Sequence, residues 1–270
     1  MYIAPDARKN IFFVGFNSND GQKWDGTGFL TGTPAVDPGQ AFHYLVTAKH
    51  VIEQIARGAA DGKVLIRINM IDGTAETFET QLDQWKFHPE DSSVDAAVAP
   101  VALGNRIDLK ALPLALMRHN NLPSWIEPGT DIFFPGMFYR HVGATQNQAL
   151  VRTGSVAAFP KERIFIEHGG SMEAYLVEAR SIGGSSGSPV FAQRETPTGR
   201  FSLDFEVYWI GLLLGHYKSP ARTRREEAGD LFEEAWINMG IAIVVPAKKI
   251  LEIIDGPDFR PARLAAGAPT

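Results

Sequence analysis

The chain has 270 residues, of which 44% are hydrophobic and 21% are charged, and its net charge at pH 7 is -5. This balance is typical of a soluble globular protein with a substantial core, and the acidic charge argues against a nucleic-acid-binding surface. The chain has no cysteine, which excludes disulfides, a thiolate nucleophile and a cysteine-ligated zinc.

The first ten residues lack the basic-then-apolar pattern of a signal peptide. No apolar run reaches the ~18 residues that a membrane helix needs. We therefore expect a cytoplasmic protein with no cofactor, no membrane partner and no nucleic-acid partner. The absence of cysteine also fits a reducing compartment.

Short apolar segments separated by Gly, Pro, Asn and Asp dominate the chain and predict an all-β fold, either a sandwich or a barrel. Many are rich in Val, Ile, Phe and Tyr, or alternate apolar and polar residues as half-buried strands do. The predicted strands are residues 10–16, 28–31, 43–47, 64–70, 77–85, 96–101, 131–138, 149–158, 163–167, 174–179, 189–191, 206–214 and 240–245.

Helical patterns are few. Residues 51–59 predict a short helix directly after His50, and residues 247–254 carry one apolar stripe that favours a terminal helix packed on the body. Residues 221–238 are charged and then place Leu231, Phe232 and Trp236 at helical spacing, which predicts a surface excursion with one buried face.

Two further segments have little periodicity. Residues 259–270 are rich in Ala, Pro and Gly and predict a loose tail. Residues 112–129 are rich in Pro, Asn and Leu, and a break between two sub-domains is expected there.

Residues 183–191 read Gly-Gly-Ser-Ser-Gly-Ser-Pro-Val-Phe and crowd small residues around Ser186. Glycines permit a tight turn that lifts a serine hydroxyl out of the fold and aims nearby N–H groups at one point. Acyl transfer needs an exposed nucleophile and donors for the developing oxyanion. Alone, the stretch also fits a Gly/Ser surface loop, so the nucleophile hypothesis needs a base and a group that orients the base.

His50 is the histidine whose surroundings fit a general base. An apolar strand delivers it to an edge and a predicted helix follows, so both sides of it are held rigidly. The alternative is an ordinary half-buried histidine at a strand end.

Asp95 is a single carboxylate at the start of an apolar strand, and burying it without a partner would cost several kcal/mol. It is either a solvated strand-start residue or a buried acceptor for a histidine N–H. Asp91 is the nearest competitor, but the apolar run begins only after Asp95.

The order His50, Asp95, Ser186 resembles the chymotrypsin-like serine peptidases. Thr-Ala-Lys-His at 47–50 is similar to their Thr-Ala-Ala-His segment, and Val-Asp-Ala-Ala-Val at 94–98 is similar to their Asp-Ile-Ala-Leu segment. Gly-Ser-Ser-Gly-Ser-Pro at 184–189 resembles their Gly-Asp-Ser-Gly-Gly-Pro segment. The resemblance covers about residues 10–254 and includes Gly-Thr-Gly-Phe at 26–29, which is similar to a segment of bacterial Deg-type enzymes.

This resemblance implies two antiparallel six-stranded β-barrels, approximately residues 10–111 and 130–246, followed by a C-terminal helix at 247–254. It implies a serine endopeptidase that acts on protein or peptide substrates. In it, Ser186 is the nucleophile, His50 is the base and Asp95 orients the base. The backbone N–H groups of Gly184 and Ser186 hold the oxyanion.

The resemblance also assigns a specificity pocket. Arg180 takes the position of its base, and Leu213, Leu214, Gly215 and Gly240 form its walls. Apolar walls favour a medium-sized hydrophobic side chain in the substrate. An Arg180 that points inward would instead favour an acidic one, and a solvated Arg180 is the third reading.

One residue departs from the trypsin pattern. Ser185 stands where trypsin-type enzymes carry an aspartate that pairs with a newly cut N-terminal amine, so activation by such a cleavage is not expected. The chain is in this respect similar to the Deg-type and glutamyl-type bacterial enzymes, without a PDZ domain. The second hypothesis is a partner-controlled or inactive sensing or binding module on the same fold, with residues 221–238 as the element that docks a regulatory protein.

Ser185 also fits the Gly-x-Ser-x-Gly motif of the α/β-hydrolases. That fold requires an acid and then a histidine after the serine. Only His216 follows Asp204 in this way, and the alternation of strands and helices is missing. The α/β-hydrolase reading is therefore disfavoured.

Overall fold

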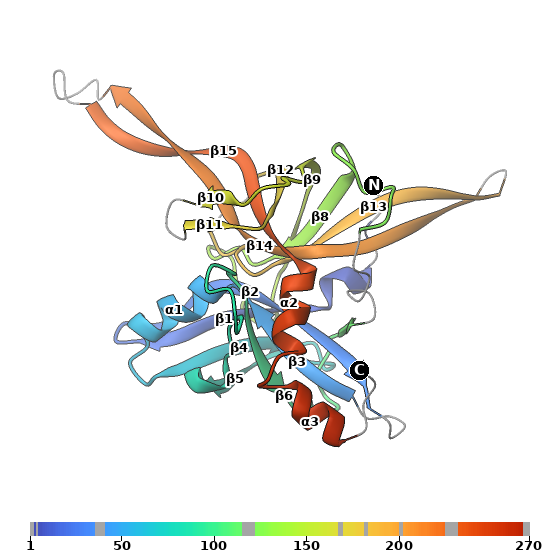
Figure 1. The fold of residues 1–270 in the computed structure, drawn as a ribbon. Helices are drawn as coiled ribbons and strands as arrows, with labels where there is room; N and C mark the ends of the chain where they lie inside the picture. Colours follow the sequence, from blue (N-terminus) through green and yellow to red (C-terminus); the bar gives the residue numbers. More distant parts are fainter. Residues whose placement is uncertain are drawn as a thin grey trace.

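The computed structural model describes residues 3, 5–35, 41–114, 122–166, 170–180, 183–199, 202–224 and 232–266. These residues form two β-structures, one from each half of the chain, with a helix from the C-terminal end lying across both (Figure 1). The expected double-barrel architecture is confirmed.

The N-terminal half is a curled antiparallel sheet in the order β5-β4-β1-β2-β3-β6, with the two-residue strand β7 (Leu112–Pro113) added in parallel to β2. The main strands are β1 (Ile11–Ser18), β2 (Gly21–Pro34), β3 (Ala41–Thr47), β4 (Lys63–Asn69), β5 (Ala75–Gln81) and β6 (Ala97–Val101). Lys86, which follows β5, exchanges backbone hydrogen bonds of 2.7 and 2.9 Å with Val98 of β6. This bridge joins the two edges of the sheet and brings it close to a closed barrel.

The C-terminal half is a closed barrel in the order β12-β15-β14-β13-β8-β9. Its strands are β8 (Asp131–Gly136), β9 (Leu150–Ala158), β12 (Tyr175–Ala179), β13 (Pro189–Gly199), β14 (Ser202–Arg224) and β15 (Phe232–Pro246). A small separate sheet pairs β10 (Ile164–Ile166) with β11 (Gly170–Met172). Closure leaves the barrel without an unpaired edge strand.

Two long hairpins, β13–β14 and β14–β15, reach out from this barrel on opposite sides of the view in Figure 1. The helical spacing expected at 221–238 is wrong for the described residues, because they are strands paired from Lys218↔Asn238 to Arg224↔Phe232. Pairing satisfies the backbone groups of each arm with those of the other, so the strand conformation continues beyond the barrel. Residues 225–231, Leu231 among them, lie outside the described residues.

The helices flank the sheets. Helix α1 (Lys49–Gly58) follows β3, and α2 (Ala247–Ile254) has the predicted bounds. The two short 3-10 helices are η1 (Pro5–Arg8) and η2 (Leu82–Gln84). The loose tail expected at 259–270 is wrong in part, because Arg260–Ala265 forms helix α3. Phe259 packs its ring edge-on to Tyr44 with the centroids 5.4 Å apart, and this contact holds the start of α3 against the N-terminal sheet.

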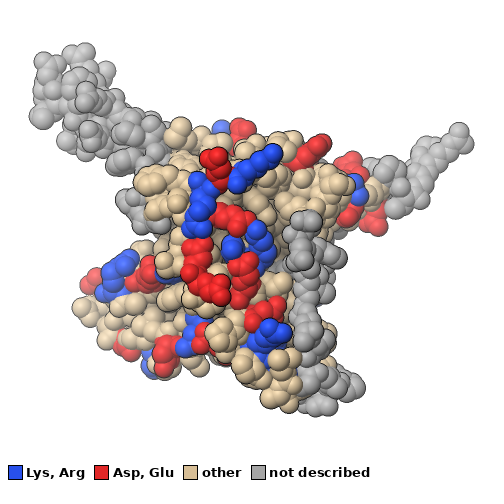
Figure 2. Space-filling model, in the orientation of Figure 1, with Lys and Arg blue, Asp and Glu red and all other residues tan. Residues whose placement is uncertain are grey.

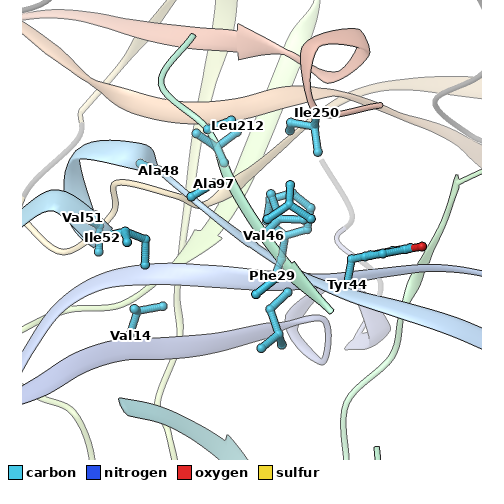
Figure 3. Close-up of a cluster of buried hydrophobic side chains, with 14 of the residues drawn as sticks. Val14, Phe29, Tyr44, Val46, Ala48, Val51, Ile52, Ala97, Leu212 and Ile250 are labelled. Atoms are coloured by element: carbon cyan, nitrogen blue, oxygen red, sulfur yellow. The ribbon is translucent and has the colours of Figure 1, made fainter. Parts of the chain in front are cut away.

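The main hydrophobic cluster joins both halves. Val46 and Ala97 of the N-terminal sheet, Leu212 of β14 and Ile250 of α2 converge in Figure 3 and are each fully buried. A second cluster fills the C-terminal barrel. Burial of this kind is the dominant favourable term in folding, and here it fixes the two halves against each other.

The change from one cluster to the other falls in the segment between the halves. Leu114 packs in the first cluster and Ile126 in the second. Both lie within residues 112–129, where the sequence predicts the break. The limits 10–111 and 130–246 for the sub-barrels stay a prediction.

The surface carries charges of both signs. Acidic and basic side chains are interleaved down the middle of the face in Figure 2. Among the ion pairs of the molecule, Arg163 lies 3.0 Å from Asp91 and Lys249 lies 2.9 Å from Glu252. None of the helices in the described ranges is long and apolar enough to cross a membrane.

Candidate active site

His50 lies in the first turn of α1, directly after β3. Ala48, which precedes the helix, is fully buried, and Val51, Ile52 and Ile55 anchor the helix in the core. The side chain of His50 is 40% exposed. A buried strand and a buried helix face therefore present a half-exposed imidazole from a rigid position.

Asp95 contacts His50 at two points. Its Oδ1 accepts a hydrogen bond from the backbone N–H of His50 at 2.7 Å, and its Oδ2 lies 2.5 Å from the imidazole Nδ1. A carboxylate in this position favours the tautomer with the proton on Nδ1, which leaves Nε2 as an acceptor.

The competing carboxylate, Asp91, faces other groups. It accepts hydrogen bonds from Ser93 and from the guanidinium of Arg163. These contacts hold the pKa of Asp91 well below its usual range. Asp91 is thus part of a separate ion pair, and Asp95 is the carboxylate on His50.

The electrostatic surroundings of His50 act in opposite directions. Burial is the largest single effect and lowers the pKa of His50, but the hydrogen bond and charge of Asp95 and the charges of Asp25 and Glu53 raise it more in sum. The net result is a raised pKa for His50. The site therefore stabilises the imidazolium form relative to an isolated histidine.

Asp25, in β2, is not among the residues to which the motifs point. Burial raises its pKa, although the charges of His50 and Lys23 act against this. Its Oδ2 is buried and has no hydrogen-bond partner among the described residues. The one feature of the sequence that could have pointed to Asp25 is its position directly before Gly-Thr-Gly-Phe.

Ser186 lies on a turn that only glycine can form at two positions. Gly184 has φ +91° and Gly187 has φ +88°, a region that side chains rarely adopt. A Cβ on Gly187 would also lie 2.0 Å from the carbonyl oxygen of Thr27. The two barrels are thus in close contact beside Ser186, and the absence of a side chain on Gly187 is what allows this contact.

The same turn lies against the segment that carries His50. A Cβ placed on Gly26 would be 2.8 Å from Val51 and 3.3 Å from the carbonyl oxygen of Ser186. The backbone N–H of Thr27 donates to that oxygen at 2.9 Å. Ser186 and the residue after His50 therefore share one neighbour, Gly26, at the junction of the two barrels.

The hydroxyl of Ser186 is turned toward the C-terminal barrel. Its Oγ donates to the carbonyl oxygen of Leu214 at 2.9 Å, and no hydrogen bond joins the described side chains of Ser186 and His50. Within the described residues, the N–H groups of Gly184 and Ser186 donate to no protein acceptor. Neither N–H is therefore taken up by another described group, although Gly184 as a whole is buried.

The neighbouring serines differ from Ser186 in exposure. Ser185 is 2% exposed and Ser188 is fully buried, whereas Ser186 is only partly buried. Of the three hydroxyls in this turn, that of Ser186 is the one a substrate could reach.

Thr27 lies within the Gly-Thr-Gly-Phe segment, but the resemblance gives it no role in the site. Its Oγ1 donates to the carbonyl oxygen of Gly184 at 2.7 Å and accepts from the backbone N–H of Met137 at 2.8 Å. This hydroxyl fixes the carbonyl of Gly184 and ties the turn to β2. Its position between two glycines was the only local signal.

The residues assigned to a specificity pocket differ in how far they are exposed. Arg180 is exposed, and its carbonyl oxygen accepts a hydrogen bond from Arg152 at 3.0 Å. Leu213 is fully buried in the core of the C-terminal barrel, so its side chain packs there. Leu214 is partly buried, and among the described residues a Cβ on Gly215 or Gly240 would meet no atom within 4 Å.

Open space beside Gly215 and Gly240 is what an incoming chain would need. Ser181 and Ile182, which follow Arg180, lie outside the described residues. In the part of the chain that the structure describes, no three or more His, Asp or Glu side chains gather in a way that could hold a metal ion.

The sequence matches no family model and no curated protein. Solved structures do match. The active form of the Rv3671c protease from M. tuberculosis is 14% identical, with 92% of this chain and 80% of that chain covered and a TM-score of 0.50. Human heparin binding protein is 12% identical, with 95% and 94% covered and a TM-score of 0.52. At such identities the similarity concerns the fold.

Proposed function

We propose that this chain, which has the double-barrel fold of the chymotrypsin-like serine proteases, is a serine endopeptidase acting on protein or peptide substrates. The observation that carries the proposal is the double contact of Asp95 with His50, beside a serine on a glycine turn. Such a histidine can act as a base toward a neighbouring hydroxyl, and such a turn can hold an oxyanion.

In the first step, Ser186 Oγ forms a bond to the carbonyl carbon of the scissile peptide and passes its proton to His50 Nε2. The carbonyl oxygen takes the negative charge and is held by the N–H groups of Gly184 and Ser186. His50 then gives the proton to the leaving nitrogen as the carbon–nitrogen bond breaks, and an acyl-enzyme remains. Water repeats the sequence and releases the acid.

Two features of the geometry support these roles. The raised pKa of His50 reflects carboxylates that stabilise the imidazolium formed after the first proton transfer. The resting hydrogen bond from Ser186 to Leu214 must break, which requires only a rotation about the Cα–Cβ bond of the serine. Catalytic hydrogen bonds are often absent from unliganded proteins and form with the substrate.

The specificity pocket is proposed to lie beside Leu214, Gly215 and Gly240. Because Gly215 and Gly240 leave open space and Leu214 is apolar, we expect a preference for a medium-sized hydrophobic side chain before the cleaved bond. The expected cytoplasmic location stays a prediction.

The test is reaction of the purified chain with a fluorophosphonate probe, followed by mass spectrometry of the labelled peptide. The proposal predicts an adduct on Ser186 and cleavage of a peptide library. No adduct and no cleavage, under conditions that fully label a reference serine protease, would overturn it.

A partner-controlled or inactive module on the same fold is the second candidate, favoured by the hydrogen bond of Ser186 to Leu214 instead of His50. Fold does not determine function, and a structural neighbour of this chain is named for binding heparin. Fast labelling of the isolated chain supports a constitutive enzyme. Slow labelling that rises when a cell extract is added supports control by a partner.

A further inference from the structure

Arg67 of β4 is 9% exposed, and its guanidinium donates hydrogen bonds to residues 142–147 in the other half of the chain. Nη1 donates to the carbonyl oxygen of Val142 at 3.3 Å and to Oδ1 of Asn147 at 2.9 Å. Nη2 donates to the carbonyl oxygens of Gly143 at 3.0 Å and Ala144 at 3.3 Å. Among the described residues no carboxylate pairs with it.

A buried cation without an anion is costly unless hydrogen bonds compensate its lost hydration. Burial lowers the pKa of Arg67, in keeping with that cost. All four acceptors come from the loop between β8 and β9. The hydrogen bonds that compensate for burying the guanidinium therefore also fix the position of the β8–β9 loop.

Asn147 and Asn69 complete the arrangement. The side-chain amide of Asn147 donates to the carbonyl oxygen of Arg67 at 2.6 Å, and its backbone N–H donates to Oδ1 of Asn69 at 2.7 Å. Asn69 in turn donates to the carbonyl oxygen of Asn147 at 3.3 Å. We call the hydrogen-bonded set of Arg67 and Asn69 in β4 and Asn147 in the β8–β9 loop the β4 clamp, because it holds the loop against the N-terminal sheet.

The other end of the same loop lies under the turn that carries Ser186. Met137 is 1% exposed and donates its N–H to Thr27, whose hydroxyl holds the carbonyl of Gly184. A Cβ on Gly184 would be 3.1 Å from Met137 Cε and 3.5 Å from the nitrogen of Tyr139. The ring of Tyr139 is the nearest group to Gly183, at 3.5 Å from a Cβ placed there.

We propose that the β4 clamp positions, at a distance, the turn of residues 183–188 that carries Ser186, which we call the oxyanion turn. Arg67 fixes the β8–β9 loop, and residues 137–139 at the start of that loop fix Gly183 and Gly184. Arg67 is then a positioning residue for the reaction. This inference rests on the proposed function for its kinetic consequence, but the mechanical link between the clamp and the turn can be measured without it.

The kinetic test compares Arg67→Ala and Arg67→Lys with Arg106→Ala. Arg106 is 66% exposed and pairs with Glu76 at 2.9 Å on the same half of the chain, so it controls for loss of a cation. Since oxyanion contacts form fully only in the transition state, we expect Arg67→Ala to lower kcat by about 10- to 100-fold with little change in KM. Arg67→Lys should lose less, millimolar guanidinium should partly restore Arg67→Ala, and Arg106→Ala should match the parent chain.

The structural test is hydrogen exchange at the amides of Gly187 and Ser188, which donate to Leu213 and Ser185 at 2.8 and 3.0 Å. Arg67→Ala should speed exchange there as well as in residues 138–148, and Arg106→Ala should change neither. Arg67→Lys serves for the same measurement if Arg67→Ala does not fold. Faster exchange confined to residues 138–148, or an equal rise in KM and fall in kcat, overturns the inference.

The two proposals fail in different ways. Absence of labelling in the parent chain would remove the proposed function. The exchange at Gly187 and Ser188 would still decide whether the β4 clamp holds the turn.

Discussion

Asp95 binds both the backbone N–H and the imidazole of His50, at 2.7 and 2.5 Å. One carboxylate thus fixes the first turn of α1 and the orientation of the ring that the turn carries. The two contacts use different oxygens of the carboxylate. An asparagine at position 95 has only one acceptor oxygen and would therefore lose one of the two contacts. The tautomer of His50 and its place in the fold depend on the same side chain.

Replacement of Asp95 by Asn should lower kcat by about 10⁴-fold, because an amide no longer enforces the tautomer that leaves Nε2 free. Asp91→Asn is the matched control, since Asp91 contacts Ser93 and Arg163 instead. It should leave kcat within about twofold, as expected for a largely surface ion pair. Steady-state kinetics on a cleaved peptide measures both, and equal losses would contradict the assignment of Asp95.

Ser186→Ala should abolish fluorophosphonate labelling and lower kcat by about 10⁵- to 10⁶-fold, because the proposed mechanism makes Ser186 the nucleophile. Ser185→Ala is the control, since Ser185 is 2% exposed and faces the protein interior. It should keep its labelling. An adduct on the Ser186→Ala variant, or a Ser185→Ala variant that does not react, would favour Ser185 as the nucleophile.

The acid limb of kcat/KM should lie above the ordinary histidine value of about 6.5, because the pKa of His50 is raised and only neutral His50 can accept the proton. Activity is then lost as the pH falls through that raised value. Asp25→Asn should move the limb to lower pH, and Glu53→Gln should move it less, since its charge contributes less to the shift. An unchanged limb in Asp25→Asn would show that Asp25 does not act on His50.

The same shift has a consequence for stability. A raised folded-state pKa means that protonated His50 favours the folded chain. This contribution should be fully present below the pKa of an unfolded histidine and lost as the pH rises through the folded-state value. The His50→Ala variant should lack it, which denaturant unfolding at several pH values would detect.

Gly187→Ala should destabilise the fold by about 2–4 kcal/mol, since it combines a left-handed backbone with overpacking. Its φ is +88°, and the added carbon would lie 2.0 Å from the carbonyl oxygen of Thr27. In Gly215→Ala the added carbon meets no described atom within 4 Å, so stability should change by under about 0.5 kcal/mol. This substitution should instead raise KM if the space beside Gly215 receives substrate. Thermal unfolding and peptide kinetics separate the two effects.

Where local spacing and long-range packing agree, the sequence predicted the structure. Residues 247–254 form α2 with the predicted bounds, because the apolar stripe that defines the helix is also the face that packs in the core. The buried strands β1, β4 and β8 were predicted from their runs of apolar and β-branched residues, because these same residues pack in the core. Three short motifs were enough to select His50, Asp95 and Ser186 as candidates, because each combines a reactive side chain with a rigid local frame.

Where a distant segment decides the conformation, the sequence was misleading or silent. The spacing of Phe232 and Trp236 predicts a helix, but antiparallel pairing with β14 makes the segment a strand. The tail was expected to be loose, but the contact of Phe259 with Tyr44 holds a helix there. Both outcomes follow from partners far away in the chain, which no local period encodes.

The sequence by itself determined the β-rich architecture and the order of the candidate site residues, because both are carried by local composition and turn chemistry. Tertiary structure alone decided the rest of the site: the second carboxylate near His50, the hydroxyl of Thr27 between Met137 and Gly184, and the clamp around Arg67. Each of these joins residues from different strands or from different halves of the chain. Their effect depends on distance and burial, and these exist only once the two halves have packed together.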